Sequence, residues 1–359
     1  MTTVAHYVER WLDLSAGFVA GHVARSRHRA VVISRDGWLN LDAFPHRPRH
    51  SLHLLRNAAP ERFKPAVLHA QLRLLLAAHR ADVVHVHFGY AAADVPPVLA
   101  GRPFVLSLHG HDVTGLLRAD PHRYDRVVGD VSAVVVPSRF LAEAAVAAGF
   151  PESVIRVIPS GVDTAFFRPS PLPSGPPIVG FAGRLVEKKG IDVLLAAWPQ
   201  VVATVPDAQL RILGDGPLAD AIPTDDPRIE RVLPDASRRG EQVRDLLQSA
   251  HVVVTPSRTA ADGDGESLLL VNLETAATGR PVVSTRHGGI AEYVDDGRTG
   301  LLVNEGDSDA VAAAITRLLT EPSLAAALAA AGPAQAARWE AAACSARVDA
   351  LYDELLAAK

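Results

Sequence analysis

Two glutamates, Glu266 and Glu274, are separated by seven residues at the end of a Gly/Asp-rich stretch that begins at Gly263. An apolar run with helical spacing starts at Ser267, a residue type that can cap a helix. Free amides at the start of such a helix would form an anion site. One carboxylate would lie at the mouth of that site and the other two turns further along. This combination of amides and carboxylates is what a nucleotide-sugar requires for its diphosphate and its hydroxyl groups.

A cationic turn, residues 183–190, follows the buried strand predicted at residues 178–182. The chain has only four lysines, and two of them, Lys188 and Lys189, lie in this turn with Arg184. A guanidinium fork and an ammonium point charge at the carboxyl end of a strand can neutralise a departing diphosphate. A solvated turn without a function is the simpler alternative.

Histidines occur twice with one residue between them. His85 and His87 lie on one predicted strand, and His109 and His111 lie at the end of another. Zinc is one interpretation of these pairs, but no cysteine lies near them and few carboxylates do. We favour neutral imidazoles that line a pocket for a hydroxyl-rich ligand. Ligands bind at the carboxyl ends of parallel strands, so we expect His87 and His109 to face that pocket.

Asp262 and Asp264 have the D-x-D spacing with which some transferases hold a divalent ion. Here they precede a predicted diphosphate-binding helix, and Arg184 and Lys189 already supply two positive charges. We therefore expect no catalytic metal and no required cofactor.

Two other motifs suggest chemistry that we do not favour. Residues 214–219 fit the dinucleotide fingerprint G-x-G-x-x-A of an NAD-binding oxidoreductase. They follow the second strand of their half rather than the first, however, and they contain Pro217, so a glycine turn without phosphate is the better interpretation. Ser267 lies in a sequence similar to the nucleophile elbow of serine hydrolases, but Leu269 replaces the required second glycine.

The motifs above belong to a longer series that runs through nearly the whole chain. Its members, in chain order, are residues 108–112, 157–163, 183–190, 212–217, 254–257, 266–274, 278–283, 288–292 and 300–303. The series resembles family 4 of the retaining glycosyltransferases. That resemblance implies an α/β GT-B fold, in which two Rossmann-like domains face each other across a cleft and a C-terminal helix crosses back to the first domain. Residues 15–19 and 262–274 are most similar to the exopolysaccharide and colanic-acid branch.

The resemblance implies retaining transfer of a hexose-type sugar from an NDP-sugar, UDP- or GDP-linked, to a hydroxyl or thiol acceptor. Polysaccharide or secondary-metabolite biosynthesis would use such a reaction, and the acceptor would be a small molecule or lipid-linked. A phosphorylase or a nucleotide-sugar epimerase of the same fold is the alternative, and a catalytically inactive binding subunit is a further one. The family usually has Gly-Phe-Gly after the first glutamate, where this chain has Ser267, Leu268 and Leu269, which puts the local sugar contacts in doubt.

The resemblance also assigns roles to residues. Glu266 would hold the sugar, Glu274 the ribose, and His109 would lie beside the transferred sugar. The predicted catalytic residues are His109, Glu266, Arg184 and Lys189. The predicted donor-binding residues are Gly17, Arg184, Lys189, Leu233, Ser267, Leu268, Leu269, Leu270 and Glu274. The predicted acceptor-binding residues are His87, His109, His111 and Asp112.

The 359 residues are enough for two domains. We expect an acceptor-binding domain at residues 1–168, a proline-rich linker at 169–177, a nucleotide-sugar domain at 178–335 and a C-terminal helix at 336–359. Residues 1–168 carry 19 Lys/Arg against 14 Asp/Glu, whereas residues 169–359 carry 17 against 26. The basic half could attract an anionic acceptor or an anionic membrane surface, and uneven surface charge without function is the alternative.

Composition excludes several classes of protein. Cys344 is the only cysteine, which excludes an intrachain disulfide. No nucleic-acid module is recognisable, and no apolar run reaches the length of a membrane span. We therefore expect a cytoplasmic enzyme with at most peripheral membrane association.

Apolar runs alternate with amphipathic stretches, the pattern of parallel α/β sheets. The predicted strands are residues 31–34, 83–86, 104–108, 133–136, 154–158, 178–182, 209–213, 229–233, 252–255, 282–284 and 301–303. The predicted helices include residues 15–25, 61–80, 138–149, 244–249, 267–278, 310–320 and 334–356.

Overall fold

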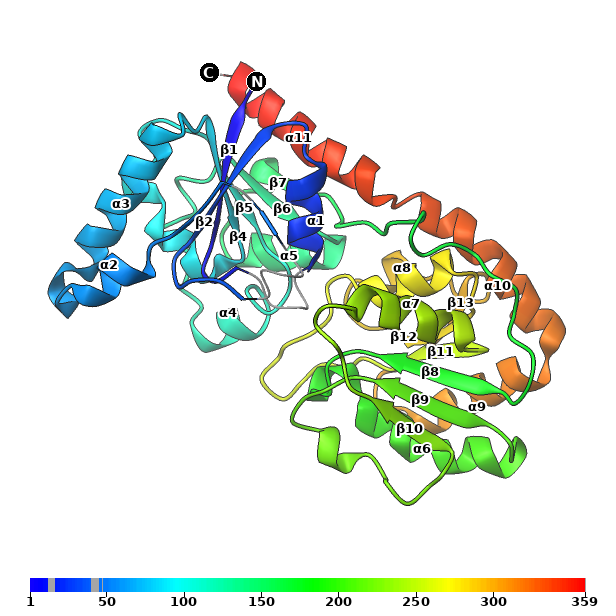
Figure 1. Cartoon of the computed structure of the whole chain (residues 1–359). Helices are drawn as coiled ribbons and strands as arrows, with labels where there is room; N and C mark the ends of the chain where they lie inside the picture. Colours follow the sequence, from blue (N-terminus) through cyan, green and yellow to red (C-terminus); the bar gives the residue numbers. More distant parts are fainter. Residues whose placement is uncertain (12–16, 40–44, 47, 359) are drawn as a thin grey trace. The chain divides into compact units, whose positions relative to one another are not determined.

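The computed structural model describes residues 1–11, 17–39, 45, 46 and 48–358, and the chain forms two compact units (Figure 1). The N-terminal unit consists of Met1–Ser160 together with Ala342–Lys359, and the C-terminal unit consists of Gly161–Ala341. Each unit has its own parallel sheet and its own hydrophobic core. The residues 12–16, which contain part of the predicted helix 15–25 and of the motif 15–19, lie outside the described residues.

The N-terminal unit has a seven-stranded sheet in the order β3-β2-β1-β4-β5-β6-β7, and all of its pairings are parallel. The strands are β1 (Thr3–Val8), β2 (Arg29–Ser34), β3 (Arg49–Ser51), β4 (Val83–His87), β5 (Phe104–Ser107), β6 (Ala133–Val136) and β7 (Ile155–Val157). The helices are α1 (Gly17–Arg25), α2 (His53–Ala58), α3 (Lys64–Ala78), α4 (Gly115–Ala119), α5 (Arg139–Ala147) and the terminal α11 (Ala341–Ala357).

The C-terminal unit has a six-stranded parallel sheet in the order β10-β9-β8-β11-β12-β13. The strands are β8 (Ile178–Ala182), β9 (Gln209–Leu213), β10 (Ile229–Val232), β11 (Val252–Thr255), β12 (Val282–Thr285) and β13 (Gly300–Val303). The helices are α6 (Ile191–Thr204), α7 (Arg239–Ser249), α8 (Leu270–Ala277), α9 (Ser308–Thr320) and α10 (Pro322–Ala337).

Strand order reverses at one place in each sheet. In the N-terminal unit this point lies between β1 and β4, and in the C-terminal unit it lies between β8 and β11. Loops that leave neighbouring strands in opposite directions open a crevice at their carboxyl ends, which is where open α/β sheets bind ligands. The two reversal points therefore locate the candidate sites.

The two faces of the N-terminal sheet bury different side chains. Val84 and Val86 of β4 point into the large core that α3 and α5 cover. Val83, on the opposite face, packs with Val348 and Tyr352 of α11, the red terminal helix beside this sheet in Figure 1. Because successive side chains alternate, His85 and His87 lie on the face that α11 covers.

The division between the units falls at Ser160–Gly161, whereas the predicted boundary was at 168/169. Val162 and Ala341 explain the difference, because they join two distant stretches of the chain. The Val162 amide donates to Trp339 O at 2.8 Å, and the Ala341 amide donates to Val162 O at 2.9 Å. Residues 161–168 therefore belong to the C-terminal unit, where Phe167 enters the core.

The proline-rich segment at 168–177 contains no helix or strand and is held by the buried Arg280. The guanidinium of Arg280 donates to Ser170 O at 2.9 Å, to Pro171 O at 2.8 Å and to Gln248 O at 2.7 Å. Prolines have no N–H group and cannot donate backbone hydrogen bonds, so the Arg280 guanidinium supplies the bonds that attach this segment to the C-terminal unit.

The predicted strands agree with the structure to within two residues at each end, but two strands were missed and three helices differ. The predicted helix 244–249 is longer in the structure and begins at Arg239. β1 and β3 were not predicted, because His6 interrupts the apolar run of β1 and β3 is wholly polar. The predicted helix 334–356 is two helices, α10 and α11, since residues 338–340 form the pairing with Val162. The predicted helix 267–278 begins only at Leu270.

Among the described residues, no single helix is both long and apolar enough to cross a membrane; α9 and α10 meet that test only as a pair, bent by 96°.

We predict that Gly190→Ala destabilises the C-terminal unit. Gly190 has φ +65°, and a Cβ there would lie 1.9 Å from Pro256 O. The loss in free energy of unfolding should exceed the ~1–2 kcal/mol that a left-handed conformation costs an ordinary residue. Gly297→Ala is the matched control, because Gly297 has φ +75° but no atom within 4 Å of the added Cβ. Denaturant unfolding that gives equal losses for both variants would contradict the close approach to Pro256.

Candidate active site

The cationic turn and the first glutamate meet at the reversal point of the C-terminal sheet. Lys188 and Lys189 end a short 3₁₀ turn (Glu187–Lys189) that follows β8. The Lys189 Nζ lies 2.8 Å from Glu266 Oε1, and the Lys188 Nζ lies 2.9 Å from Asp264 Oδ2 and 4.0 Å from Glu266 Oε1. These four side chains are at most 15% exposed, so they form a buried cluster with no net charge.

The loop that carries Glu266 is held by His287, a residue that the sequence analysis did not single out. The Glu266 amide donates to His287 Nε2 at 3.0 Å, and His287 Nδ1 lies 3.1 Å from Glu305 Oε2. The Gly289 amide donates to Glu266 O at 3.2 Å. Glu266 is therefore fixed from both sides of its peptide unit.

The charged groups in this cluster shift one another's pKa values. Burial alone would raise the pKa of Glu266, but Lys189 and Lys188 outweigh burial and hold that pKa below its ordinary value. Burial lowers the pKa of Lys189, and the Glu266 carboxylate opposes part of that shift. Arg184 also acts on both groups, which shows that its guanidinium lies near them. Arg184 is exposed, so it is the cation of this set that solvent reaches most easily.

Glu274 lies within α8 and has a different environment from Glu266. Burial raises its pKa to about 7, and the nearby Arg239 limits the rise. Arg239 begins α7, and its own pKa is lowered by burial and raised by Glu274. Sequence reasoning missed Arg239, because Arg238 and Arg239 in a polar stretch form no recognisable motif. The two glutamates therefore differ near neutral pH: Glu266 is ionised, and Glu274 is close to half protonated.

A buried hydrogen-bond network fixes the start of α8. Thr255 Oγ1 at the end of β11 lies 2.8 Å from Asn272 Oδ1 and 2.9 Å from Ser284 Oγ, and Asn272 Nδ2 donates to Ser284 Oγ at 3.1 Å. This network orients the first turn of the helix, whose leading amides have no partner within the helix.

Ser267 is not the cap of α8, which is a correction to the sequence prediction. Ser267 and Leu269 are buried in the turn before the helix, and Leu269 takes the cap position without a side-chain hydrogen bond. Leu233 follows β10 and is 62% exposed, so an apolar surface is available there.

The turn at residues 214–217 supports the cationic turn rather than a dinucleotide. The Leu185 amide donates to Asp215 O at 2.8 Å, and a Cβ on Gly216 would lie 2.6 Å from Leu185 O. The turn leads into a three-residue 3₁₀ turn instead of an α-helix, so it lacks the helix terminus that binds a pyrophosphate.

The predicted histidines of the N-terminal unit lie at the reversal point of its sheet and are joined there by others. His85 and His87 share one face of β4 with stacked rings 4.1 Å apart, and His6 of β1 lies opposite His85. His6 Nδ1 lies 3.0 Å from His87 Nε2. Burial lowers the pKa of all three rings well below the ordinary value, so they are neutral.

His109 lies between two aromatic rings. Its ring centre is 4.8 Å from that of Phe18 and 4.5 Å from that of Phe88. Phe88 has φ +66°, a conformation that costs energy for a bulky residue and that clusters at functional sites. Burial lowers the pKa of His109 to about 3. His109 is therefore a neutral imidazole and cannot act as a charged acid near pH 7.

Asp112 positions the loop that carries His109, and its predicted role in acceptor binding stays a prediction. Its buried carboxylate accepts the amides of His109 at 2.9 Å, Gly110 at 2.8 Å and Gly89 at 3.1 Å. These bonds occupy the carboxylate and hold the His109 loop against the loop after β4. His111 lies in the same loop and is half-buried.

A cavity of ≈ 40 Å³ lies on the α11-facing side of this sheet. His87 and His109, which we expected to face a pocket, both line it. Gly17, predicted to bind the donor, begins α1, and the next residues, Phe18 and Val19, line the same cavity. The remaining lining residues are His22, His85, Ser107, Val135, Ile158, Pro159, Ser160, Cys344, Ser345 and Val348.

Comparison with known families accounts for most of the chain. The family model "Glycosyltransferase Family 4" matches residues 18–166, and the model "Glycosyl transferases group 1" matches residues 176–321. The chain belongs to family 4 of the glycosyltransferases, and the predicted resemblance is confirmed.

Similar proteins include polysaccharide and glycolipid enzymes. A GDP-mannose-dependent alpha-(1-6)-phosphatidylinositol monomannoside mannosyltransferase of Mycolicibacterium smegmatis is 34% identical over 73% of this chain and 74% of its own length. A putative colanic acid biosynthesis glycosyltransferase of Escherichia coli is 31% identical over 87% of this chain and 78% of its own. The second similarity agrees with the predicted exopolysaccharide branch.

Solved structures show the same fold at lower identity. Anabaena HepE in complex with UDP-glucose has a TM-score of 0.78 and 19% identity, covering 99% of this chain and 100% of that chain. Sucrose-phosphate synthase from Thermosynechococcus elongatus has a TM-score of 0.76 and 20% identity, and each chain is fully covered. The predicted GT-B fold, with two Rossmann-like domains, is confirmed.

We predict that Glu266→Gln destabilises the C-terminal unit by ~3 kcal/mol at neutral pH, because it leaves Lys189 buried without its counter-charge. The lowered pKa of Glu266 means that this stabilisation is present above the ordinary carboxyl pKa and is lost as the pH falls below it. Glu230→Gln is the control, since the Arg211–Glu230 pair is similarly close, at 3.0 Å, but its carboxylate is 59% exposed. Equal unfolding energies for the two variants between pH 6 and 8 would show that the pair at Lys189 contributes no more than a surface pair.

Proposed function

We propose that this glycosyltransferase moves a hexose from a nucleoside diphosphate-hexose to a hydroxyl group of an acceptor, with retention at the anomeric carbon. The observation that carries the proposal is the buried pair of ammonium groups, Lys188 and Lys189, at the reversal point where the loop to α8 carries Glu266. Two ammonium groups and a nearby guanidinium form a site for an anion with at least two charges.

The diphosphate would bind to the lysine ammonium groups that Glu266 and Asp264 neutralise in the free protein. Arg184 and Lys189 would stabilise the charge that builds on the departing diphosphate, and the first amides of α8 would add hydrogen bonds. Glu266, released from Lys189, would accept hydrogen bonds from sugar hydroxyls. Arg184 is exposed and so can reach the diphosphate without breaking a buried contact.

Glu274 is the proposed ribose ligand. An ionised carboxylate can accept hydrogen bonds from both ribose hydroxyls, which a protonated one cannot do as well. Arg239 would hold the carboxylate in its ionised form as the nucleotide binds. The exposed Leu233 provides an apolar surface for the base.

The sugar and base are proposed from relatives. The mycobacterial relatives at 31–34% identity are GDP-mannose-dependent, whereas HepE binds UDP and UDP-glucose. GDP-mannose is therefore the first donor to test, and UDP-hexoses are the second. The acceptor is proposed to be a sugar or a lipid-linked glycan, since the relatives act on phosphatidylinositol mannoside or in polysaccharide synthesis.

The chemistry needs no charged base from the N-terminal unit. The C1–O bond to the diphosphate breaks as the bond from C1 to the acceptor oxygen forms on the same face. The departing phosphate oxygen takes the acceptor proton. His109 and His87 are neutral and can bind hydroxyl groups without titrating near pH 7. We propose that no metal assists the diphosphate, because the two lysines and Arg184 supply the positive charge.

A nucleotide screen tests this function directly. Thermal unfolding should be measured with GDP, UDP, ADP and dTDP, and one of them should raise the midpoint through linkage. The matching hexose donor is then tested for transfer, and NMR of the product reports whether the anomeric configuration is retained. If no nucleoside diphosphate stabilises the protein, the proposed donor site is wrong; if the product is inverted, the mechanism is wrong.

We predict that Lys189→Ala and Arg184→Ala each lower kcat by about 10²-fold, the usual loss for one preorganised electrostatic donor. Calorimetry should show weaker binding of the nucleoside diphosphate and unchanged binding of the bare nucleoside. Wild-type affinity should be the same with EDTA as with Mg²⁺. Arg317→Ala is the control, because Arg317 forms an exposed pair with Glu321 in the same unit, outside the lysine cluster and the turns that support it. A Mg²⁺-dependent affinity, or nucleoside binding that weakens equally, would contradict the protein-built diphosphate site.

We predict that nucleotide affinity rises with pH through the pKa of Glu274, which is about 7. Ribose binding favours the ionised carboxylate, so protons compete with the ligand below that pH. Glu274→Gln should raise Kd by the ~1.5–3 kcal/mol of a charge-assisted hydrogen bond and should abolish this pH dependence. Glu266→Gln should keep the pH dependence and lower mainly the single-turnover rate. The same pH slope in Glu274→Gln as in the wild type would remove Glu274 from the ribose role.

A further inference from the structure

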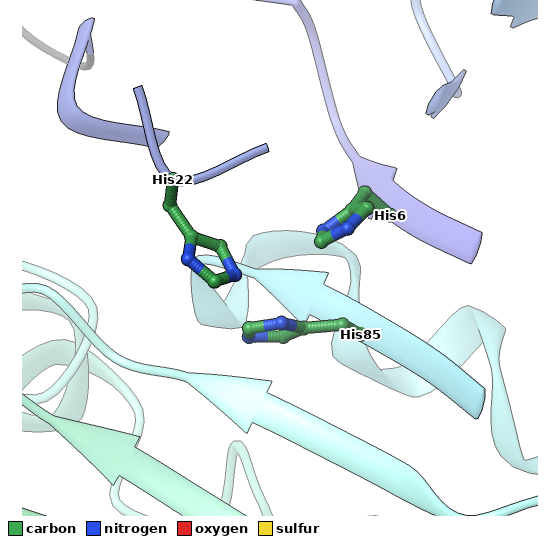
Figure 2. Close-up of side chains that lie close together, drawn as sticks. All are labelled: His6, His22 and His85. Atoms are coloured by element: carbon green, nitrogen blue, oxygen red, sulfur yellow. The ribbon is translucent and has the colours of Figure 1, made fainter. Parts of the chain in front are cut away.

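A second cluster of chemically active side chains lies in the N-terminal unit and shares no residue with the cluster of Lys188 and Lys189. His6, His22 and His85 come from β1, α1 and β4, and one ring nitrogen of each lies within 4.8 Å of the others. Figure 2 shows the three rings directed toward one another from these separate elements.

The topology of the sheet brings these three histidines together although they are distant in the sequence. Parallel register places His6 beside His85 on one face of the sheet, at its reversal point. Helix α1 lies over that face and contributes His22, whose ring centre is 5.8 Å from that of His6 and 6.1 Å from that of His85. His6 and His85 are at most 1% exposed, and His22 is half-buried.

Two of the rings already have the outer hydrogen bonds of metal ligands. His6 Nδ1 is paired with His87 Nε2 at 3.0 Å, and His85 Nε2 lies 2.7 Å from Ser107 Oγ. A metal-bound histidine usually donates its second N–H to such a partner, which fixes the tautomer and aims the lone pair at the ion. His6 Nε2 is buried and has no hydrogen-bond partner among the residues that the structure describes.

A fourth polar group lies within hydrogen-bond distance of the other two rings, those of His22 and His85. The Tyr352 hydroxyl, from α11, is 2.5 Å from His85 Nδ1 and 3.2 Å from His22 Nε2. His22 and His85 also line the ≈ 40 Å³ cavity described above, which has room for water. Three imidazoles and one oxygen ligand make a four-coordinate set.

The three imidazoles are in the protonation state that binds a metal ion. Burial keeps these imidazoles neutral, and neutral imidazole is the form that binds a metal. A buried ring nitrogen without a partner costs free energy that a metal–nitrogen bond would repay.

We propose that His6, His22 and His85 bind one divalent transition metal ion, with zinc the best fit, and that the Tyr352 hydroxyl or a water takes the fourth position. Zinc–nitrogen bonds of about 2.0–2.1 Å in a tetrahedron place the nitrogens about 3.4 Å apart. The ring nitrogens lie within 4.8 Å of one another, so the rings must close by up to about 1.4 Å. The half-buried His22 on α1 can make most of that movement. The ion would join α1 and α11 to the end of the sheet, and it is independent of the diphosphate site.

The test uses full-length protein without a polyhistidine tag, stripped with a chelator and dialysed. Titration with Co²⁺, followed by its visible absorption, should show one equivalent in a nitrogen-rich, four-coordinate site, and Zn²⁺ should displace it. Zn²⁺ should also raise the unfolding temperature of the stripped protein. Circular dichroism checks that each variant below is folded.

His22→Gln should lose this equivalent, with affinity reduced by more than the about 10–100-fold that loss of an outer partner costs. Ser107→Ala keeps all three ligands and should fall within that 10–100-fold range. His79→Gln is the matched control, because His79 forms another close histidine pair, with its Nε2 2.6 Å from His50 Nε2, and should retain full binding.

Absence of a four-coordinate cobalt spectrum at one equivalent would overturn the proposal. So would loss of binding in His79→Gln with retention in His22→Gln, because the metal would then lie at the other pair. Nucleoside diphosphate binding to the same samples separates this result from the donor site: it should be unchanged by stripping, whether or not the histidines bind a metal.

Discussion

The ion pair between Lys189 and Glu266 is the interaction on which the chemistry of the C-terminal unit depends. Burying an ammonium group without a partner costs several kcal/mol, so the free protein must supply a counter-charge. Glu266 supplies it at 2.8 Å, and Asp264 does the same for Lys188. The cluster is neutral in the free protein, and in the proposed function a diphosphate would replace the carboxylates as the partner of the lysines. The same pair would then both stabilise the fold and keep two ammonium groups in place for the donor.

Several unrelated parts of the chain serve to hold this pair in place. Gly190 lets the lysine turn approach Pro256, and the turn at 214–217 packs against Leu185. His287 holds the Glu266 loop through its amide. None of these groups is itself proposed to touch a substrate, yet a shift in any one of them would separate charges that need to meet within 3 Å. The motifs therefore fix the geometry around the site as well as supplying groups to it.

Parts of this arrangement were predictable from the sequence, because they depend on local order. The strands rich in Val and Ile were found, as were the cationic turn and the Glu-x7-Glu stretch. The start of α8 was not, since Ser267 has a capping side chain but lies buried before the helix. Arg239 carries no motif and becomes relevant only through its position beside Glu274. The boundary at Ser160 depends on a pairing between residues 162 and 340, which no local pattern reveals.

The histidines show why residue spacing alone does not determine chemistry. His85 and His87 are two residues apart and therefore lie on the same face of β4. The other two histidines of the proposed metal site come from elsewhere: His22 is on α1, and His6 is on β1. Parallel register, not sequence distance, brings position 6 beside position 85, and the terminal helix adds Tyr352 from more than 260 residues away. The acidic loop at 262–264 has the more familiar metal spacing, yet Asp264 is already paired with Lys188. A cation would therefore be better accommodated among these neutral imidazoles, where His6 Nε2 has no hydrogen-bond partner among the described residues, than among carboxylates that lysines have already neutralised.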